Sequence, residues 1–440
     1  MKIFKASFVA GIALLSIFFM LQDSHAQSSI RDNMRKQLEM QRQQDSQAVE
    51  KAREQLRDIQ KMIREKHLSF RAEMTEALKQ RIQDITGLKA PSRLSSSAKR
   101  QTINGEKALS RFVKKRKGSG NRNVKGGFMS LSEDEDLWYK PAEEMNFDDI
   151  YDLPVDDDIY SRRESDNIYN RRPQRREEKK VEPKREERTP ERKQPKRTQP
   201  DRQSSDSQDL AYLANPTLAA FNWKDKNRVT PIRHQQTCGS CWAFTTVSLL
   251  EASYKIQQNK DYDFSEQQIV DCARGNNGQR AGSCNGGWYG NAFESLQRRG
   301  AWLEEKAKYK NRDYTCPGFE PTPYKVVSWG YIRPDGGTPT VAEMKKALTK
   351  YGPIATTVKV TPPFQAYAGG VFDEHTRLNA PNDVNHAVVL VGWDDSKGRH
   401  GSWLLRNSWG TQWGEQGYMW IEYGCNGVGY GAAWAVADVQ

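Results

Sequence analysis

Two closely spaced cysteines raise the question of which chemistry they serve. The segment QQTCGSCWAF, residues 235–244, places Cys238 and Cys241 three residues apart, with a tryptophan after the second. Such a pair serves zinc sites and dithiol redox sites, and a cysteine at a helix start can act as a nucleophile. A zinc site needs a second ligand pair, which the four other, singly placed cysteines do not supply, and no βαβ pattern surrounds the pair. The sequence therefore favours a nucleophile and predicts neither a metal nor a cofactor.

A cysteine nucleophile requires a thiolate, a base and a group that orients the base. Cys241 opens the apolar helical pattern CWAFTTVSLLEASYKIQQ, and a helix N-terminus stabilises a thiolate. His386 lies in the strand-like run VNHAVVLVGW, and Asn407 in RNSWGTQWGEQGY offers a carbonyl that fixes one imidazole nitrogen. The Gln235 side chain and the Cys241 N–H are expected to donate to an oxyanion. Taken alone, a strand histidine is more often a packed core residue, and Asn-Ser-Trp is more often a turn. The evidence for a nucleophile is that Gln235, Cys241, His386 and Asn407 all occur together.

Charge is distributed unevenly along the chain. The 440 residues carry a formal net charge of +12, but residues 212–440 hold 24 Lys and Arg against 21 Asp and Glu, a net of only +3. The remaining +9 therefore belongs to the first half. Residues 1–26 resemble a signal peptide, with early lysines, a short apolar core and small residues before Ala26. The alternative is an uncleaved membrane anchor, although the core is shorter than the ~20 residues of a bilayer span.

The region between the predicted signal peptide and the C-terminal half consists of two parts of different composition. Residues 27–90 are predicted to be a helical pro-region, with a thin apolar seam at Val49–Ile63 and a second amphipathic stretch from Phe70 to Ile85. Gly87 and Pro91 are predicted to end that second helix. Residues 91–210 are predicted to be a disordered, charged linker, because they hold too little apolar surface to repay ordering. Its stretch 162–202 is either a solvated linker or a polyanion contact.

The folded unit is expected at residues 211–440, where apolar runs alternate with Gly-rich turns. The segments QTCGSCWAF, FSEQQIVDCA, SCNGGW, VNHAVVLVGW and RNSWGTQWGEQGY together resemble the papain-like cysteine proteases, the papain and cathepsin family, over about 217–440. The resemblance implies an α+β fold of two halves, one helical and one an antiparallel β-barrel, with the site between them. It assigns Cys241 as nucleophile, His386 as base, Asn407 as orienting group and Gln235 as oxyanion donor. Gln236 departs from the glycine usual in the family.

The resemblance also implies where a substrate binds. Gly286 and Gly287 are expected to pair with an extended peptide, and Trp288 with Tyr289 to form an apolar wall. Gly431 is expected at the floor of the pocket for the second residue before the cut. No acid stands there, so an apolar residue is expected at that substrate position. Two tryptophans are expected to support the site: Trp409 and Trp413.

The cysteines are paired by the resemblance, because sequence alone leaves 15 pairings of six cysteines. It joins Cys238 to Cys284 and Cys272 to Cys316, and it keeps Cys241 as a thiol. The family's third bridge needs a cysteine in the segment 371–380, which has none. Cys425 is therefore expected outside both bridges.

These features predict a secreted cysteine endopeptidase made as a zymogen, which acts on protein or peptide substrates. The cut that yields the mature enzyme is expected between about 203 and 218, after the exposed basic stretch. Its location is expected to be extracellular or periplasmic, or endolysosomal in a eukaryote. Two alternatives remain open: a non-catalytic binding protein with this fold, and a polyanion-binding protein acting through its basic arm. The sequence does not indicate an oligomeric state.

Overall fold

The computed structural model describes residues 3–91, 94–118, 215–318, 320–380 and 382–439, all within one compact unit. The predicted signal segment 1–26 falls where only a helical backbone is described. The charged stretch 119–214, with the predicted polyanion contact and the expected cut, lies outside the described residues. Among the helices searched, none combines the length and apolar character needed to cross a membrane.

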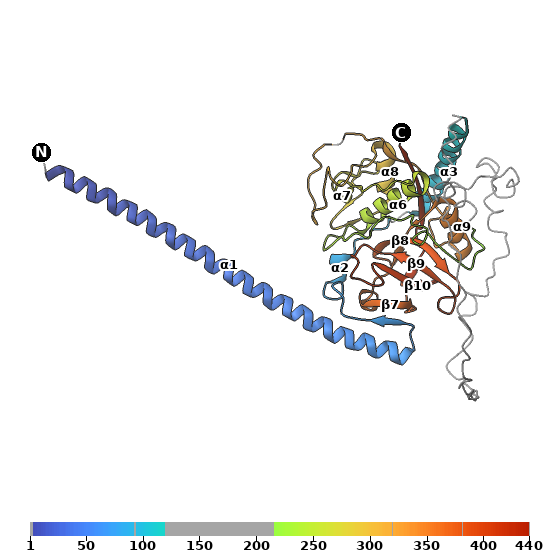
Figure 1. The fold of residues 1–440 in the computed structure, drawn as a ribbon, viewed down its shortest axis with the longest axis horizontal. Helices are drawn as coiled ribbons and strands as arrows, with labels where there is room; N and C mark the ends of the chain where they lie inside the picture. Colours follow the sequence, from blue (N-terminus) through green and yellow to red (C-terminus); the bar gives the residue numbers. More distant parts are fainter. Residues whose placement is uncertain (1–2, 92–93, 119–214, 319, 381, 440) are drawn as a thin grey trace, which may run out of the picture. The chain divides into compact units, whose positions relative to one another are not determined.

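The helical half is organised around a helix that is buried on nearly all sides. Helix α6 (Cys241–Gln258) buries 15 of its 18 residues, most of them apolar, together with polar side chains such as Glu251 and Lys255. It ends at Asn259, which adopts the left-handed conformation at φ 53°. Helices α7 (Glu266–Cys272) and α8 (Tyr289–Arg299) pack against it, and the short strands β3 (Gly282–Ser283) and β4 (Gly286–Gly287) lie beside it. Figure 1 shows these three helices together on one side of the C-terminal part.

The second half is a sheet in which most neighbouring strands are antiparallel. Its order is β1-β7-β10-β9-β8-β6-β11-β5, with β2 paired to β8, and the β7–β10 pair is parallel. The predicted α+β class is thus confirmed. Strand β8 (His386–Asp394) is central and buried along nearly its whole length, as its run of valines and leucine predicts. The other strands are β1 (Phe70–Ala72), β2 (Ala220–Asn222), β5 (Tyr324–Tyr331), β6 (Ile354–Val358), β7 (Tyr367–Phe372), β9 (Ser402–Arg406), β10 (Tyr418–Glu422) and β11 (Ala433–Val439).

Shorter elements connect these strands. Helix α9 (Val341–Tyr351) begins with a capping box in which Thr340 and Glu343 satisfy each other's backbone N–H groups. Helix α10 (Pro362–Gln365) begins with Thr361 as its cap, and the turn η3 (Cys425–Gly427) follows β10.

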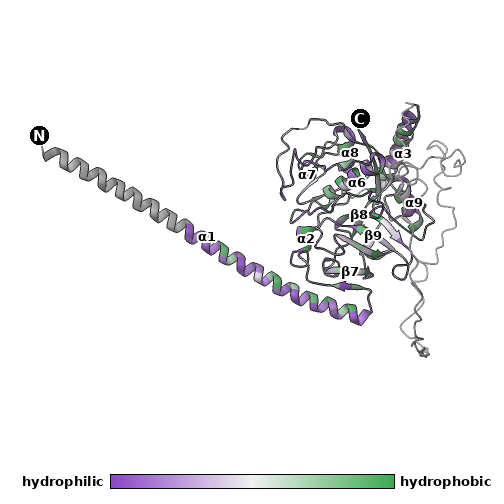
Figure 2. Cartoon of the chain, in the orientation of Figure 1, coloured by the Kyte–Doolittle hydropathy of each residue, from purple (hydrophilic) through white to green (hydrophobic). Residues whose placement is uncertain are grey.

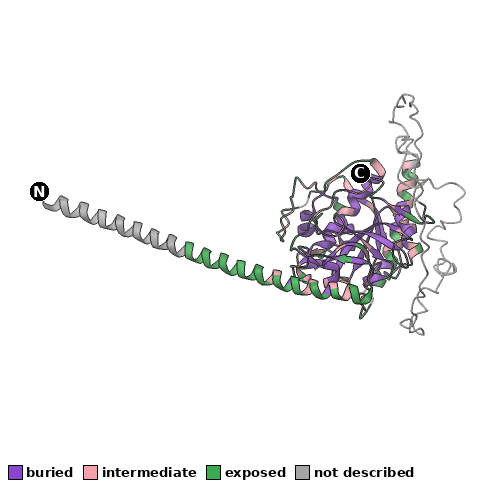
Figure 3. Ribbon diagram, turned by 60° about the horizontal axis from the view of Figure 1, so that its bottom comes forward, coloured by how far each residue is buried: buried purple, intermediate pink, exposed green. Residues whose placement is uncertain are grey.

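The first part of the predicted helical pro-region 27–90 is helical in the structure, as far as Lys66. Helix α1 (Ile3–Lys66) is polar over most of its described surface (Figure 2). Its described N-terminal turns are exposed, whereas buried residues fill the C-terminal part of the chain (Figure 3). Ala52 and Ile59 of the apolar seam are 1% and 5% exposed and join the core beneath the sheet. The seam therefore packs on another part of this chain.

The second amphipathic helix was wrongly predicted. Phe70–Ala72 forms strand β1 on the edge of the sheet, paired with β7, and only Ile82–Ile85 forms a helix, α2. Phe70 packs on Phe372, with ring centroids 4.8 Å apart. The helical spacing of the apolar residues misled the prediction, because the segment joins the core as a strand and turns and not as one helix. Tertiary packing overrides local helical periodicity here.

Residues 94–118 were wrongly assigned to the disordered linker. They form helix α3 (Leu94–Gly118), which packs along β5. Leu94, Ala98 and Leu109 are at most 6% exposed and share one helical face. Gly105 lies on the same face, and a Cβ there would stand 2.1 Å from the Trp329 carbonyl oxygen. The high charge of the segment hid this narrow apolar face.

Polar contacts reinforce the docking of α3. Gln101 Nε2 donates to the Trp329 carbonyl at 2.9 Å, and Thr102 Oγ1 donates to the Tyr331 carbonyl at 3.1 Å. Glu106 pairs with Lys350 of α9 at 3.5 Å. Helix α3 is thus held by close backbone approach and by side-chain hydrogen bonds.

Gly105→Ala is expected to weaken α3 docking, although alanine favours an isolated helix by about 1 kcal/mol over glycine. The reason is the clash of the new methyl group with Trp329. Hydrogen exchange of residues 94–118 should become faster in this variant. The matched control is Asn104→Ala at an exposed neighbouring position, which should leave exchange unchanged or slower. Equal exchange in Gly105→Ala and the unaltered chain would contradict the close approach.

Candidate active site

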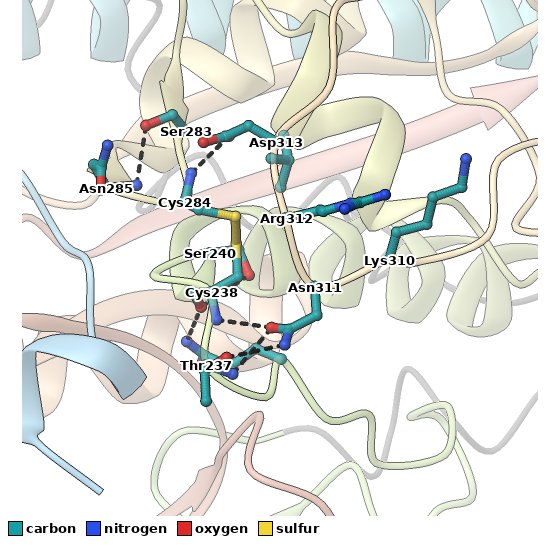
Figure 4. The surroundings of a disulfide bond; sticks show 12 residues. Thr237, Cys238, Ser240, Ser283, Cys284, Asn285, Lys310, Asn311, Arg312 and Asp313 are labelled. Atoms are coloured by element: carbon teal, nitrogen blue, oxygen red, sulfur yellow. Dashed lines mark hydrogen bonds between the residues drawn. A yellow bond between two sulfur atoms is a disulfide. The ribbon is translucent and has the colours of Figure 1, made fainter. Parts of the chain in front are cut away.

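Cys241 is the first residue of α6, and the loop before it is fixed by a disulfide and by side chains from a distant loop. Cys238 is joined to Cys284 by a disulfide. The side-chain oxygen Oδ1 of Asn311 accepts from Thr237 N–H and Cys238 N–H at 3.0 and 2.9 Å (Figure 4). Asp313 accepts from Cys284 N–H at 2.8 Å. These contacts hold the nucleophile loop against the glycine-rich turn that carries Cys284.

The structure joins the same two cysteine pairs that the resemblance implies. Besides Cys238–Cys284, Cys272 is bonded to Cys316. Cys241 and Cys425 stand outside both disulfides and are buried.

The structure brings Cys241, His386 and Asn407 together from three separate elements. His386 begins β8, and its Nε2 lies 2.8 Å from the side-chain oxygen Oδ1 of Asn407. The N–H of Ala387, the next residue in β8, donates to Cys241 Sγ at 3.4 Å. The other ring nitrogen, Nδ1 of His386, is buried and has no hydrogen-bond partner among the described residues. With Nε2 donating to Asn407, Nδ1 carries the lone pair that a base needs.

Gln235 lies in the same site, held by groups from both halves. Its carbonyl oxygen Oε1 accepts from Ser408 Oγ at 2.6 Å, which fixes the amide so that Nε2 donates into the site. Its backbone N–H donates to the Ser408 carbonyl at 2.8 Å. Gln236 adopts φ 55°, a left-handed conformation that glycine takes without strain. Gln236, which stands where glycine is usual, therefore adopts a strained backbone conformation, while the neighbouring Gln235 keeps its hydrogen bonds.

Trp409 lies against the histidine, and Trp413 packs against Trp409. The Trp409 ring centroid is 4.9 Å from that of His386, and Trp413 meets Trp409 edge-on at 5.2 Å. Trp409 is only 5% exposed. The pair therefore shields the His386–Asn407 hydrogen bond from water.

A segment of the N-terminal region occupies the site. The Ile85 carbonyl accepts from Gln235 Nε2 at 3.2 Å and from Trp409 Nε1 at 3.0 Å. Gly87 and Leu88 both donate their N–H groups to the Asn385 carbonyl, at 3.1 and 3.0 Å. The donor expected to hold an oxyanion is thus already satisfied by the chain itself.

The same segment pairs with the glycine-rich turn expected to bind substrate. Gly287 N–H donates to the Gly87 carbonyl at 2.8 Å, and Lys89 N–H donates to the Gly287 carbonyl at 2.9 Å, in a parallel bridge. Gly87 approaches the nucleophile loop so closely that a Cβ on it would stand 2.1 Å from the Gly239 carbonyl oxygen. Gly87 was predicted to stop a helix, but here it permits backbone contact on both sides.

Burial keeps the cysteine and histidine neutral in this state. Both side chains are fully buried, and burial raises the pKa of the Cys241 thiol to about 12 although the N–H groups of Ala387 and Trp242 lower it. Burial lowers the pKa of His386 to about 4, against the opposing effect of the Asn407 hydrogen bond. The thiolate expected at the start of α6 is therefore not the favoured form while residues 85–89 cover the site, because desolvation outweighs the helix N-terminus.

The predicted substrate wall is only partly as expected. Gly286 and Gly287 form β4 beside the site, and a Cβ on Gly431 would lie 2.8 Å from the Trp288 ring. Tyr289, however, is fully buried, stacks on Trp288 and donates its hydroxyl to the Gly431 carbonyl. Trp288 is also buried, at 2% exposed, so neither ring is open to a substrate in this covered state and the wall stays a prediction.

Sequence reasoning missed three contributors to the site. Ser408 orients Gln235, Ala387 N–H contacts the sulfur, and the Ile85 carbonyl accepts the hydrogen bond that Gln235 is expected to give an oxyanion. The first two lie next to residues that were identified, but their roles depend on backbone direction. The run IQDITGLKAP around Gly87 carried the only local signal for the third, and it was interpreted as a helix end.

Comparison with known proteins agrees with this geometry. Residues 217–436 match the family model described as "Papain family cysteine protease", which is half of the chain. The chain therefore belongs to the papain family of cysteine proteases.

Individual relatives cover the same part of the chain. Pro-cathepsin H of Mus musculus is 36% identical over 219 residues, which cover 49% of this chain and 64% of the relative. Cathepsin K of Gallus gallus is 38% identical over 205 residues, covering 46% and 58%. The chain thus spans less than two thirds of the length of these curated relatives. A solved chain from work on the mite allergens Blo t 1 and Der p 1 is 32% identical, with a TM-score of 0.46, covering 50% of this chain and 71% of that one.

Gly87→Val is expected to displace residues 85–89, because its side chain would overlap the Gly239 backbone. Overpacking of this kind costs about 1–3 kcal/mol, which corresponds to about 5- to 160-fold greater opening. The rate at which a thiol reagent labels Cys241 in the uncut chain should rise by that factor. The neighbouring Lys89→Ala keeps the backbone contacts and should label as slowly as the unaltered chain. Unchanged labelling in Gly87→Val would show that this segment does not protect the thiol.

Proposed function

We propose that this chain is the zymogen of a secreted cysteine endopeptidase that hydrolyses peptide bonds in proteins. The observation that carries the proposal is the convergence of Cys241, His386, Asn407 and Gln235, with the His386 Nδ1 lone pair left unoccupied. A purely structural protein gains nothing from burying an imidazole nitrogen without a partner.

The proposed reaction follows from the geometry. Once the site is open, proton transfer from Cys241 to His386 Nδ1 yields a thiolate, which attacks the substrate carbonyl carbon. Gln235 Nε2 and the Cys241 N–H donate to the developing oxyanion. His386 then gives its proton to the leaving amine, and a thioester remains on Cys241. Water, deprotonated by the same imidazole, hydrolyses the thioester and restores the thiol. Throughout, Asn407 accepts from Nε2 and keeps the ring aligned.

The latent state is proposed to depend on the N-terminal region. Residues 85–89 take the oxyanion donor and the glycine-rich turn, so a substrate cannot use either. Strand β1 on one side and helix α3 on the other fix this segment at both ends. Cutting between 203 and 218, as the sequence predicts, breaks the covalent link between the N-terminal region and the peptidase unit. The contacts that cover the site stay intact.

The compartment and substrates are argued from chemistry. Two disulfides fit an oxidising compartment, which supports export by the segment 1–26. The substrates proposed are proteins or peptides bound in extended form along Gly286 and Gly287, with an apolar residue near Trp288 and Gly431. An endopeptidase is proposed because the sequence holds no insertion rich in histidine and cysteine after Cys284 that would close one end of the cleft.

Labelling with an epoxide that needs an activated thiol tests the proposed reaction. The processed enzyme should be labelled at Cys241 and lose peptidase activity, and Cys241→Ala should be neither labelled nor active. His386→Ala should lower kcat/KM by about 10²–10⁴-fold, the usual contribution of a general base. Asn407→Ala should cost less, because it removes only the orienting group. Peptide cleavage by Cys241→Ala would overturn the proposed nucleophile.

Acid is expected to release the latent state after the linker is cut. The pKa of His386 is about 4 while covered, against about 6.5 for an exposed histidine. The open form therefore binds a proton that the covered form excludes as the pH falls from about 6.5 to 4. This linkage favours opening by on the order of 3 kcal/mol below pH 4 and has no effect above about pH 7.

A specific protease site placed within 190–200 allows this release to be measured. The cut chain should stay latent and elute as one species at pH 7, and it should become active between pH 6 and 4. The same chain carrying Gly105→Ala should activate at higher pH, because α3 is held less tightly. Full activity on cutting at pH 7 would contradict latency by non-covalent contacts.

A further inference from the structure

A second cluster of reactive side chains lies outside the active site, at the end of the sheet. His375 follows β7, Glu422 ends β10, and Cys425 opens the turn η3. His375 Nε2 lies 2.8 Å from Glu422 Oε2 and 3.3 Å from Cys425 Sγ. One ligand atom from each residue lies within 4.8 Å of the other two. We propose that these three residues form a zinc-binding site.

The arrangement around the imidazole favours a cation over a simple hydrogen bond. A single ring nitrogen carries either one hydrogen or one lone pair, so Nε2 cannot serve Glu422 and Cys425 equally well. A cation at the centre accepts a lone pair from each of the three atoms. Ligand atoms bound about 2.0–2.3 Å from one tetrahedral zinc lie roughly 3.3–3.6 Å apart. The imidazole nitrogen lies 2.8 and 3.3 Å from its two neighbours, at most about 0.8 Å short of this range, and the third pair of ligand atoms lies within 4.8 Å.

The chemistry of the three ligands selects zinc. Thiolate and imidazole are softer than the oxygen ligands that calcium and magnesium require. A thiolate and a carboxylate together balance the two charges of Zn²⁺, which matters because the Glu422 side chain is only 3% exposed and Cys425 is fully buried. Three protein ligands leave one position for water. His375 is 33% exposed at its side chain and provides the path by which an ion enters.

Surrounding hydrogen bonds hold the ligands in place. The second oxygen of Glu422, Oε1, accepts from Arg399 N–H at 2.7 Å, which directs Oε2 toward the histidine. Asn426 is 1% exposed; its carbonyl oxygen Oδ1 accepts from Thr376 N–H at 3.2 Å and its Nδ2 donates to the Lys359 carbonyl at 3.0 Å. The segment that carries His375 and the turn that carries Cys425 are thereby tied together. Such supporting contacts orient the ligands of metal sites.

Cobalt and zinc titrations of the full-length chain carrying Cys241→Ala test the site. Four of the six cysteines are in disulfides, so this background leaves Cys425 as the one thiol, and it also prevents self-cleavage. Added Co²⁺ should produce a thiolate-to-metal charge-transfer band and the visible spectrum of a tetrahedral ion. Isothermal titration in thiol-free buffer should show one zinc ion bound per chain, with release of the Cys425 proton.

Variants of the ligands distinguish this site from others. Cys425→Ser should abolish the charge-transfer band, and His375→Asn should weaken zinc binding by at least about 10- to 100-fold, the loss that even an outer-shell change causes. The control His234→Asn removes an exposed histidine outside the cluster and should leave both signals unchanged. Circular dichroism shows whether each variant is folded. If Cys425→Ser does not fold, His375→Asn provides the test of the ligand set. Absence of the charge-transfer band in the Cys241→Ala chain, or zinc affinity unaltered by His375→Asn, would overturn the proposal.

Discussion

The contact between the start of α6 and the start of β8 determines the geometry of the whole site. Ala387 N–H reaches Cys241 Sγ at 3.4 Å, so the helical half and the sheet meet at the sulfur. Both partners are fully buried, and each is the first or second residue of an element anchored deep in its own core. Side chains that begin rigid elements have little freedom, which is the condition for holding a nucleophile and a base in register.

This junction also explains why the covered state is neutral. Closing the site removes water from Cys241 and His386, and desolvation acts against charge on either group. The same segment that excludes water, residues 85–89, satisfies Gln235 through the Ile85 carbonyl. Latency thus has two components, one electrostatic and one of hydrogen bonding, and both depend on one short stretch of backbone.

The N-terminal region acts as an integral part of this fold. Strand β1 extends the sheet, and α3 packs along β5 with its Gly105 against Trp329. These contacts flank residues 85–89, so the short segment is held from both ends instead of by its own few hydrogen bonds. At the β1 end of the sheet, where β7 pairs with β1 and β10 pairs with β7, the cluster of His375, Glu422 and Cys425 joins the segment after β7 to the end of β10.

The sequence by itself determined the chemistry. The residues around Cys241, His386 and Asn407 combine rare side chains with strong local patterns, so the elements that carry them could be predicted and their roles proposed from short segments. The sequence also carried the two cysteine pairings, through the resemblance. It could not determine which groups each side chain contacts, such as the hydrogen bond from the Tyr289 hydroxyl to the Gly431 carbonyl.

Only the tertiary structure decided the conformation of residues 70–85 and 94–118. Phe70–Ile85 has helical spacing, and 94–118 has the charge of a linker, yet the first forms a strand and turns and the second forms a docked helix. In both cases the free energy comes from contacts with residues more than 200 positions away, such as Gly105 with Trp329 and Phe70 with Phe372. The His375–Glu422–Cys425 cluster was equally hidden, because its residues are 47 and 3 positions apart and meet only when β7 and β10 pair. Local sequence patterns report propensity, whereas these positions are set by surfaces that exist only in the folded chain.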